Sequence, residues 1–141
     1  MLRQSLHELV IATRGRGFYE FTREVGQWVE QGKFKNGLVT LHLRHTSASL
    51  LIQENADPDV RVDFEQWSNR AIPDGASYFV HRLEGADDMP AHLKSGIYGT
   101  SQTIPICDGR LLLGTWQGVY LGEHRDDGGS RTVVATLMGK E

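Results

Sequence analysis

The stretch from His81 to His92 contains the residue types that bind divalent cations and transfer protons. Two histidines and three carboxylates, Glu84, Asp87 and Asp88, fall within these twelve residues. Carboxylate oxygens and neutral imidazole nitrogens are metal ligands, and both groups are costly to bury without partners. The histidines favour a functional site, because an ordinary helix cap does not need them. The alternative is a solvated acidic loop.

A helix is predicted to begin inside this stretch. Pro90 suits the first turn of a helix, and Asp88 is placed to cap it. Free backbone N–H groups at such a helix start can receive phosphate oxygens. The pattern therefore places acids, imidazoles and a candidate anion-binding helix end together.

The bulk composition is that of one folded domain spanning residues 1–141. The chain is 39% hydrophobic and 23% charged, with a net charge of −3 that argues against nucleic-acid binding. Its single cysteine, Cys107, excludes an intrachain disulfide and a cysteine-rich zinc site. No apolar run reaches the roughly 20 residues of a membrane span, and the N-terminus is a poor signal peptide. We therefore expect a cytoplasmic protein without a membrane or nucleic-acid partner.

Hydrophobic periodicity predicts an α+β fold, a mainly antiparallel sheet with helices packed on one face. The expected helices span residues 22–32 and 58–72 and a short segment after Asp88, and the second should bury Phe64 and Trp67. The expected strands are residues 3–12, 18–21, 38–46, 50–53, 78–81, 103–107, 110–123 and 132–137.

The last third of the chain carries two hairpin signals. Asp108-Gly109 predicts a tight turn, and residues 125–131 predict a second hairpin loop. Glu123 and Arg131 flank that loop, so they could pair across it as an ordinary salt bridge. Glycines at every fourth position surround Trp116 and predict close contact with a ligand or a neighbouring subunit.

His45 lies at the end of a predicted strand. It falls on the opposite face from His42 and is followed by small hydroxylated residues, Thr46-Ser47-Ala48-Ser49, which leave room for a ligand. A histidine in such a place is more often hydrogen-bonded at the edge of the core. Both interpretations stay open.

Five spaced motifs resemble the YjbQ family, also called the secondary thiamine-phosphate synthase family. They run in order over residues 14–139: His45–Leu50 (HTSASL), Glu54–Pro58 (ENADP), Glu84–His92 (EGADDMPAH), Gly114–Gly118 (GTWQG), and Gly122–Arg125 (GEHR) with Gly128–Arg131 (GGSR). The resemblance implies a compact α+β protomer that forms a homotrimer. It also implies a divalent metal ion held by three histidines, His45, His81 and His92.

The activity implied by the resemblance joins hydroxymethylpyrimidine pyrophosphate to a thiazole phosphate, giving thiamine phosphate and pyrophosphate. The resemblance leaves open whether this is the main or a secondary reaction. The same resemblance puts Glu84, Asp87, Asp88 and Glu123 in the candidate catalytic set. The candidate substrate-binding set is Ser47, Asn55, Lys94, Trp116, Gln117 and Arg131. Lys94, Arg125 and Arg131 are the cations that suit a phosphorylated substrate, and Trp116 offers an aromatic face for a pyrimidine.

The ligand types leave the metal and the reaction open. Three imidazoles suit zinc, whereas pyrophosphate departure usually recruits Mg²⁺, which Asp87 and Asp88 could hold through oxygen. A zinc-type hydrolase of a small phosphorylated or cyclic substrate, with Glu84 or Glu123 as general base, fits the same residues. A non-enzymatic trimer that binds a metabolite or a metal ion is the third alternative.

Overall fold

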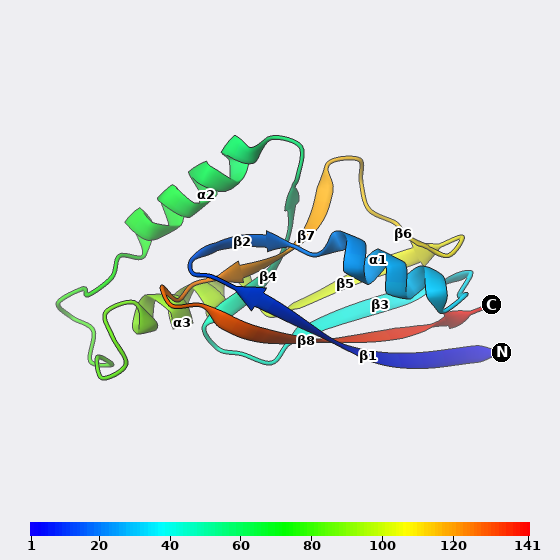
Figure 1. The fold of residues 1–141 in the computed structure, drawn as a ribbon, viewed down its shortest axis with the longest axis horizontal. Coiled ribbons are helices and arrows are strands. Elements are labelled where there is room, and N and C mark those ends of the chain that lie inside the picture. Colours follow the sequence, from blue (N-terminus) through cyan, green and yellow to red (C-terminus); the bar gives the residue numbers. More distant parts are fainter.

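Two antiparallel sheets form the body of the protein (Figure 1). The computed structural model describes all residues, 1–141. The five-stranded sheet has the order β1 (Leu2–Thr13), β8 (Gly129–Lys140), β3 (Asn36–Leu43), β5 (Ser101–Cys107) and β6 (Arg110–Leu111). The three-stranded sheet has the order β2 (Gly17–Glu20), β7 (Gln117–Glu123) and β4 (Ala48–Glu54). The helices are α1 (Thr22–Gln31), α2 (Pro58–Ala71) and α3 (Asp88–Tyr98).

The α+β class with antiparallel pairing is confirmed, but the strands form two sheets rather than one. Alternation along β3 and β8 turns Val39, Leu41 and Val133 inward, where they are buried against β4, β7 and α1. Leu50 and Leu121 supply the facing layer from the smaller sheet. The outer face of the larger sheet keeps large aliphatic side chains exposed.

The connection after β7 is not the predicted hairpin. The expected strand over residues 110–123 is broken into β6 and β7, and β7 and β8 belong to different sheets. Residues 124–128 therefore cross from one sheet to the other. The turn at Asp108-Gly109 is confirmed, since both residues have positive φ angles, 50° and 77°.

Helix α2 stands at one end of the molecule and is only partly buried (Figure 1). The prediction of a buried stripe is wrong for Trp67, which is 62% exposed, while Phe64 packs edge-on against Phe18. Ser68 is the only fully buried residue of this helix. The predicted strand at residues 78–81 is absent, because residues 72–87 form an irregular loop. None of the helices combines the length and apolar character needed to cross a membrane.

Side chains of the same protomer explain why glycines occur near Trp116. A Cβ at Gly118 would lie 2.6 Å from the Glu20 carboxylate, and one at Gly122 would lie 2.5 Å from Ser49 Oγ. The close approach was therefore correctly predicted but its partner was not, since these side chains of the same chain make it. Trp116 itself is 62% exposed in the protomer.

Candidate metal centre

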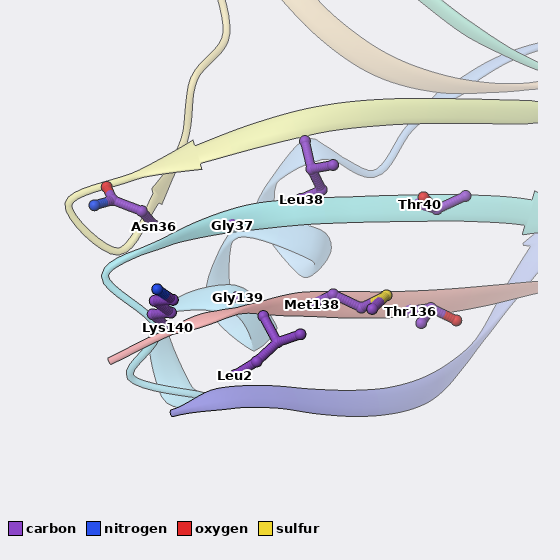
Figure 2. Close-up of a pocket in the computed structure, with 9 residues that line it drawn as sticks. All are labelled: Leu2, Asn36, Gly37, Leu38, Thr40, Thr136, Met138, Gly139 and Lys140. Atoms are coloured by element: carbon purple, nitrogen blue, oxygen red, sulfur yellow. The ribbon is translucent and has the colours of Figure 1, made fainter.

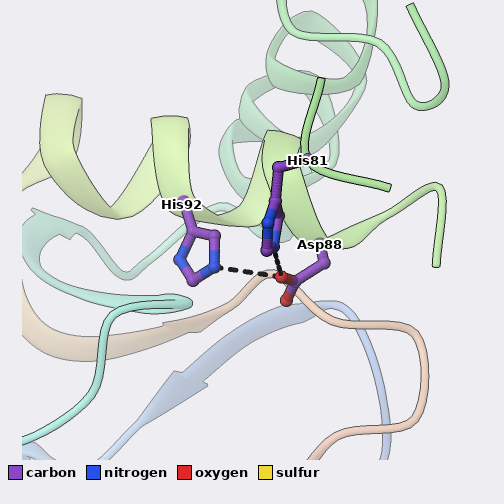
Figure 3. Close-up of side chains that lie close together, drawn as sticks. All are labelled: His81, Asp88 and His92. Carbon is purple, nitrogen blue, oxygen red and sulfur yellow. Dashed lines mark hydrogen bonds and ion pairs between the residues drawn. The ribbon is translucent and has the colours of Figure 1, made fainter. Parts of the chain in front are cut away.

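Three side chains from the stretch His81–His92 converge on one point (Figure 3). The Nε2 atoms of His81 and His92 lie 2.7 and 3.0 Å from Asp88 Oδ2, and the three ligand atoms lie within 4.8 Å of one another. Asp88 and His92 are one helical turn apart on α3, so both project from the same face. His81 approaches from the preceding loop.

The hydrogen bonds of His92 define how its ring is oriented. Its Nδ1 lies 2.7 Å from the backbone oxygen of Thr46, which can only accept, so Nδ1 carries a proton. The Nε2 atom of a neutral ring then presents a lone pair to the Asp88 carboxylate. A cation, either a proton on the ring or a metal ion, is needed to make this contact favourable. A backbone carbonyl that fixes the outer nitrogen of a histidine is also typical of metal ligands.

Asp88 is held as a buried carboxylate. Its side chain is 2% exposed, and Arg125 Nη1 pairs with Oδ1, the oxygen that faces away from the histidines. Burial alone would raise the pKa of Asp88, but the hydrogen bond from His81 and the charges of His92 and Arg125 outweigh it. The pKa of Asp88 therefore lies below its ordinary value. The group stays ionised, as a metal ligand must.

Asp87 anchors the neighbouring loop. Its Oδ2 accepts from Arg125 Nε at 3.0 Å and from the backbone N–H of Asp126 at 2.9 Å. Burial opposes ionisation, but these hydrogen bonds lower the pKa of Asp87. Arg125 Nη2 also donates to the backbone oxygen of Glu84 at 2.9 Å, which keeps Glu84 beside the centre. Thus Asp87 and Glu84 border the cluster without joining its ligands.

Glu123 and Arg131 form a separate buried pair. Arg131 Nε and Nη2 lie 2.8 and 2.5 Å from the two Glu123 oxygens, and Thr13 Oγ1 donates at 2.7 Å. The backbone N–H of Arg125 adds a fourth bond at 3.1 Å. Burial would raise the pKa of Glu123, but the bonds from Arg131 and Thr13 lower it. The salt bridge between these residues is confirmed, and every oxygen of the carboxylate is paired.

His45 is not part of the histidine–aspartate group. Its Nε2 accepts the backbone N–H of Thr132 at 2.8 Å, which occupies the lone pair that a metal would use. Arg131 lies beside the other nitrogen and also donates to the backbone oxygen of Ser47. Burial and the Arg131 charge lower the pKa of His45, so a neutral ring is favoured. Of the two interpretations of His45, the hydrogen-bonded one describes the protomer.

Four other predicted residues lie away from the cluster. Lys94 is buried on another side of α3, where its Nζ donates to Asn69 of α2 at 2.6 Å. Asn55 and Gln117 lie at the far end of the smaller sheet, because Glu54 pairs with Gln117 while Ala48 pairs with Glu123. Seven residues of extended strand span about 20 Å, so Asn55, Trp116 and Gln117 lie well away from the Glu123 end.

The start of α3 offers less to an anion than predicted. The N-cap is Asp87 rather than Asp88, and the helix begins at Asp88 itself. Pro90 has no N–H, while the Asp88 N–H donates to Gly85 and the Ala91 N–H to Asp87. Binding of phosphate by this helix end is therefore not supported.

Several residues of the site were not foreseen in these roles. Thr46 acts through its backbone oxygen and Thr13 comes from a strand 110 residues before Glu123, so neither leaves a local pattern. Arg125 was a candidate phosphate partner, and the adjacent acids Asp87 and Asp88 were the available signal for an ion pair. His124 is buried beside Ser49 Oγ at 2.8 Å; burial and the Lys94 charge lower its pKa to about 3.

The fold and this cluster define a small α+β protein with a candidate divalent-metal centre. Comparison with known proteins gives the family. The model of the UPF0047 protein YjbQ-like family matches residues 7–140, so the chain belongs to the YjbQ (UPF0047) family.

Relatives match over nearly the whole chain. The UPF0047 protein YjbQ of Escherichia coli O157:H7 is 48% identical over 133 residues, which cover 94% of this chain and 96% of the relative. A UPF0047 protein of Synechocystis is 46% identical over 98% of this chain and 94% of its own length. A solved structure from Clostridium acetobutylicum, titled an uncharacterized conserved protein of the yjbq/upf0047 family, is 32% identical with a TM-score of 0.85. It covers 93% of this chain and 98% of its own. These names establish the family and assign no activity.

Proposed function

We propose that the protein is a metal-dependent enzyme that acts on a small phosphorylated molecule. The observation that carries this proposal is the pair of imidazole nitrogens aimed at one oxygen of a buried aspartate, with His92 fixed from behind by a backbone carbonyl. Three protein ligands leave further coordination positions for substrate or water. That arrangement is typical of catalytic rather than structural metal sites.

The ligand set favours a first-row transition ion such as zinc over magnesium. Two nitrogens and one carboxylate oxygen suit zinc or iron, whereas magnesium prefers oxygen ligands and retains its waters. A divalent ion bound there would supply Lewis-acid stabilisation to phosphate oxygens. Arg125 positions Asp88, and the Thr46 carbonyl positions His92. Glu84 remains the candidate general base beside the centre, since the oxygens of Glu123 are occupied.

For the reaction itself, we propose the thiamine-phosphate synthase activity that the family resemblance implies, as a main or a secondary reaction. Its leaving group, pyrophosphate, carries several negative charges that a metal and nearby cations would neutralise. In this proposal Trp116, Gln117 and Asn55 would reach the substrate only from a neighbouring subunit, because the strand length separates them from the cluster of their own protomer.

The alternative reaction is hydrolysis of a small phosphorylated or cyclic substrate. The nitrogen-rich ligand set favours it, because two histidines and one carboxylate with open positions are also the ligands of zinc hydrolases. Both reactions require the same cluster and differ in the nucleophile, a thiazole nitrogen in one and water in the other.

Metal-stripped protein reconstituted with Zn²⁺, Mn²⁺ or Mg²⁺ tests the proposal. We expect turnover only with a bound divalent ion, and Asp88→Asn should abolish it. Synthase activity is measured as thiamine phosphate formed from the two precursors, and hydrolysis as phosphate released from each precursor alone. Activity of the synthase with Mg²⁺ but not zinc would favour the first reaction, and zinc-dependent hydrolysis the second. Neither activity with any metal, although ligand still binds, would leave a metabolite-binding protein and refute the enzyme.

We also propose that the implied homotrimer forms through the outer face of the larger sheet. Leu2, Leu38 and Met138 lie exposed on three neighbouring strands around a hollow of about 490 Å³ (Figure 2). Leu6 continues this apolar face along β1. Exposed apolar faces of this kind mark contacts between proteins, and a second copy is the partner that family resemblance indicates.

Sedimentation velocity tests the trimer. The wild type should sediment as three protomers, and Leu38→Glu should shift it to smaller species. Val62→Glu on the exposed side of α2 serves as the control and should leave the trimer intact. A monomeric wild type would contradict this part of the proposal.

A further inference from the structure

A polar groove of about 570 Å³ lies beside the histidine–aspartate cluster. It runs from the end of β3 to the second half of α3, and His92 forms one of its walls. Its lining is His42, Leu43, Arg44, His45, Thr46, His92, Ser95, Gly96, Gly99 and Thr100. The lining contains an arginine and three histidines but no carboxylate, in a protein whose net charge is −3. Arg44 is therefore the one permanently charged residue of the groove lining.

Arg44 supplies the fixed positive charge of this groove. The salt bridges of the protomer use Arg3, Arg16, Arg125 and Arg131, and Arg44 is not among them. Arg44 is exposed, and its backbone N–H is anchored to the Thr132 oxygen. An arginine without a carboxylate partner can offer its planar fork of N–H donors to a phosphate group.

His45 lines the same space and is fixed by β8. Because its Nε2 accepts from the Thr132 N–H, the proton of the neutral ring is on Nδ1. Arg131 Nη1 lies 3.4 Å from this nitrogen, so this side of the ring faces another N–H donor. The segment after β3 therefore brings the Arg44 guanidinium to the groove, and hydrogen bonds with the backbone of Thr132 hold both Arg44 and His45.

Gly96 points independently to something that approaches α3 from the groove. It lies inside α3, and a glycine inside a helix makes the helix less stable than an alanine would. A Cβ built at Gly96 would meet no atom within 4 Å, so packing inside the protomer does not require a glycine here. Gly99 also lines the groove, but its φ angle of 98° is reason enough for a glycine at that position. The missing side chains widen the groove next to His92.

We propose that this groove binds the phosphate or pyrophosphate group of the substrate, with Arg44 as its main charged partner and Gly96 as the residue that keeps it open. This inference rests on the proposed function for the identity of the anion as a substrate group. It replaces Lys94 and Arg131, whose side chains are engaged with Asn69 and Glu123, as the source of the binding charge. His92 then joins the two parts of the site, since it lines the groove and belongs to the metal cluster.

Calorimetric titration of the zinc-loaded full-length protein with inorganic pyrophosphate, phosphate and sulfate tests the groove. Arg44→Gln should raise the dissociation constant for pyrophosphate about tenfold or more, since it removes charged hydrogen bonds. Gly96→Ala should raise that constant severalfold and also raise the midpoint of thermal unfolding. The opposite directions of these two effects separate a narrowed groove from a damaged fold.

Two matched controls come from α1. Arg23 is exposed and forms no salt bridge, and a Cβ at Gly26 also meets nothing within 4 Å. Arg23→Gln should leave pyrophosphate binding unchanged, and Gly26→Ala should stabilise the fold without weakening binding. A wild type that does not bind pyrophosphate, or an Arg44→Gln variant with wild-type affinity, would overturn the inference.

Bound zinc, measured on every sample, distinguishes this inference from the proposed function. Arg44→Gln should retain the zinc content of the wild type. Wild-type protein that binds no zinc but binds pyrophosphate through Arg44 would refute the metal-dependent enzyme and keep the anion groove. Protein that binds zinc, but whose pyrophosphate affinity is the same in the wild type and in Arg44→Gln, would refute the anion groove and keep the metal-dependent enzyme. A preference for pyrophosphate over phosphate would identify the group that occupies the groove.

Discussion

Asp88 and Glu123 are both buried carboxylates paired with an arginine, yet their surroundings differ in one respect. Glu123 receives an N–H or O–H donor at every contact, from Thr13, Arg131 and the Arg125 backbone. Asp88 has an arginine on one oxygen and two imidazole nitrogens on the other. One of those nitrogens, on His92, is an acceptor when the ring is neutral.

This difference separates a structural ion pair from a group that could hold a metal ion. The Glu123 pair is complete, so a further cation would only compete with Arg131. The Asp88 cluster is complete only when a cation lies between the carboxylate and the His92 ring. Burial and salt bridges therefore do not distinguish the two kinds of site. The distinguishing feature is whether the atoms around the carboxylate donate or accept hydrogen bonds.

The largest expected effect is on stability at the Glu123 pair. Arg131→Ala should lower the free energy of unfolding by about 3–5 kcal/mol, because it leaves a buried carboxylate without its main partner. Chemical denaturation measures this loss. Arg3→Ala, which removes an exposed salt bridge with Glu141, should cost less than about 1 kcal/mol. Metal content of Arg131→Ala should match the wild type, and metal loss in the folded variant would contradict the separation of the two regions.

A large effect on metal binding is expected at His92. His92→Ala should weaken zinc binding by more than about 100-fold, the upper range for losing an outer partner of a metal ligand. Titration against a chromophoric chelator gives the affinity, and circular dichroism should show a fold like that of the wild type. His42→Ala, which removes an exposed histidine outside the cluster, is the control. Equal zinc affinity in both variants would remove His92 from the ligands.

A smaller effect is expected at Arg125, which supports Asp88 without touching the histidines. Arg125→Gln should weaken zinc binding about 10–100-fold, because Asp88 loses the partner that orients it. The same chelator titration checks this. An affinity unchanged by the substitution would mean that the helix alone fixes the carboxylate.

The smallest effect is the pH dependence contributed by His124, near the Glu123 pair. Its pKa is lowered to about 3 in the fold, so below the ordinary value of 6.5 the unfolded chain binds a proton that the folded one does not. Stability is therefore complete above pH 6.5 and falls on acidification, with a slope approaching about 1.4 kcal/mol per pH unit near pH 5. Urea denaturation between about pH 7 and pH 5 measures the slope. His124→Asn should show a shallower slope, and an identical slope would contradict burial of the neutral ring.

The predictable part of the site is local in sequence. Asp88 and His92 meet because they are four residues apart on a helix, and His81 lies shortly before it, so the stretch itself indicated the cluster. His45 was different, because its partner Thr132 is 87 residues away and its hydrogen bond depends on how β3 ends beside β8. The local sequence pattern could not show whether the His45 ring was available to a ligand or already hydrogen-bonded to the backbone.

The same limit applies to the fold. Alternation correctly predicted β1 and most of β3, although β3 ends at Leu43 rather than at residue 46, so His45 lies just after the strand. The Asp108-Gly109 dipeptide correctly predicted its turn, since a turn depends on neighbouring residues. The local sequence pattern also predicted a hairpin at residues 125–131, although β7 and β8 lie in different sheets. Which sheet a strand joins depends on contacts across the whole core. The predicted burial of Trp67 was wrong for a related reason. A helical stripe shows which residues share a face, but not whether another element covers that face.

The most direct test of the central claim is a crystal structure of the zinc-loaded protein with anomalous diffraction recorded on both sides of the zinc absorption edge. We expect one strong peak per protomer, about 2.0–2.2 Å from His81 Nε2, His92 Nε2 and Asp88 Oδ2, with Arg131 still paired to Glu123. A peak at another group of residues, or none beside Asp88 at saturating zinc, would contradict it.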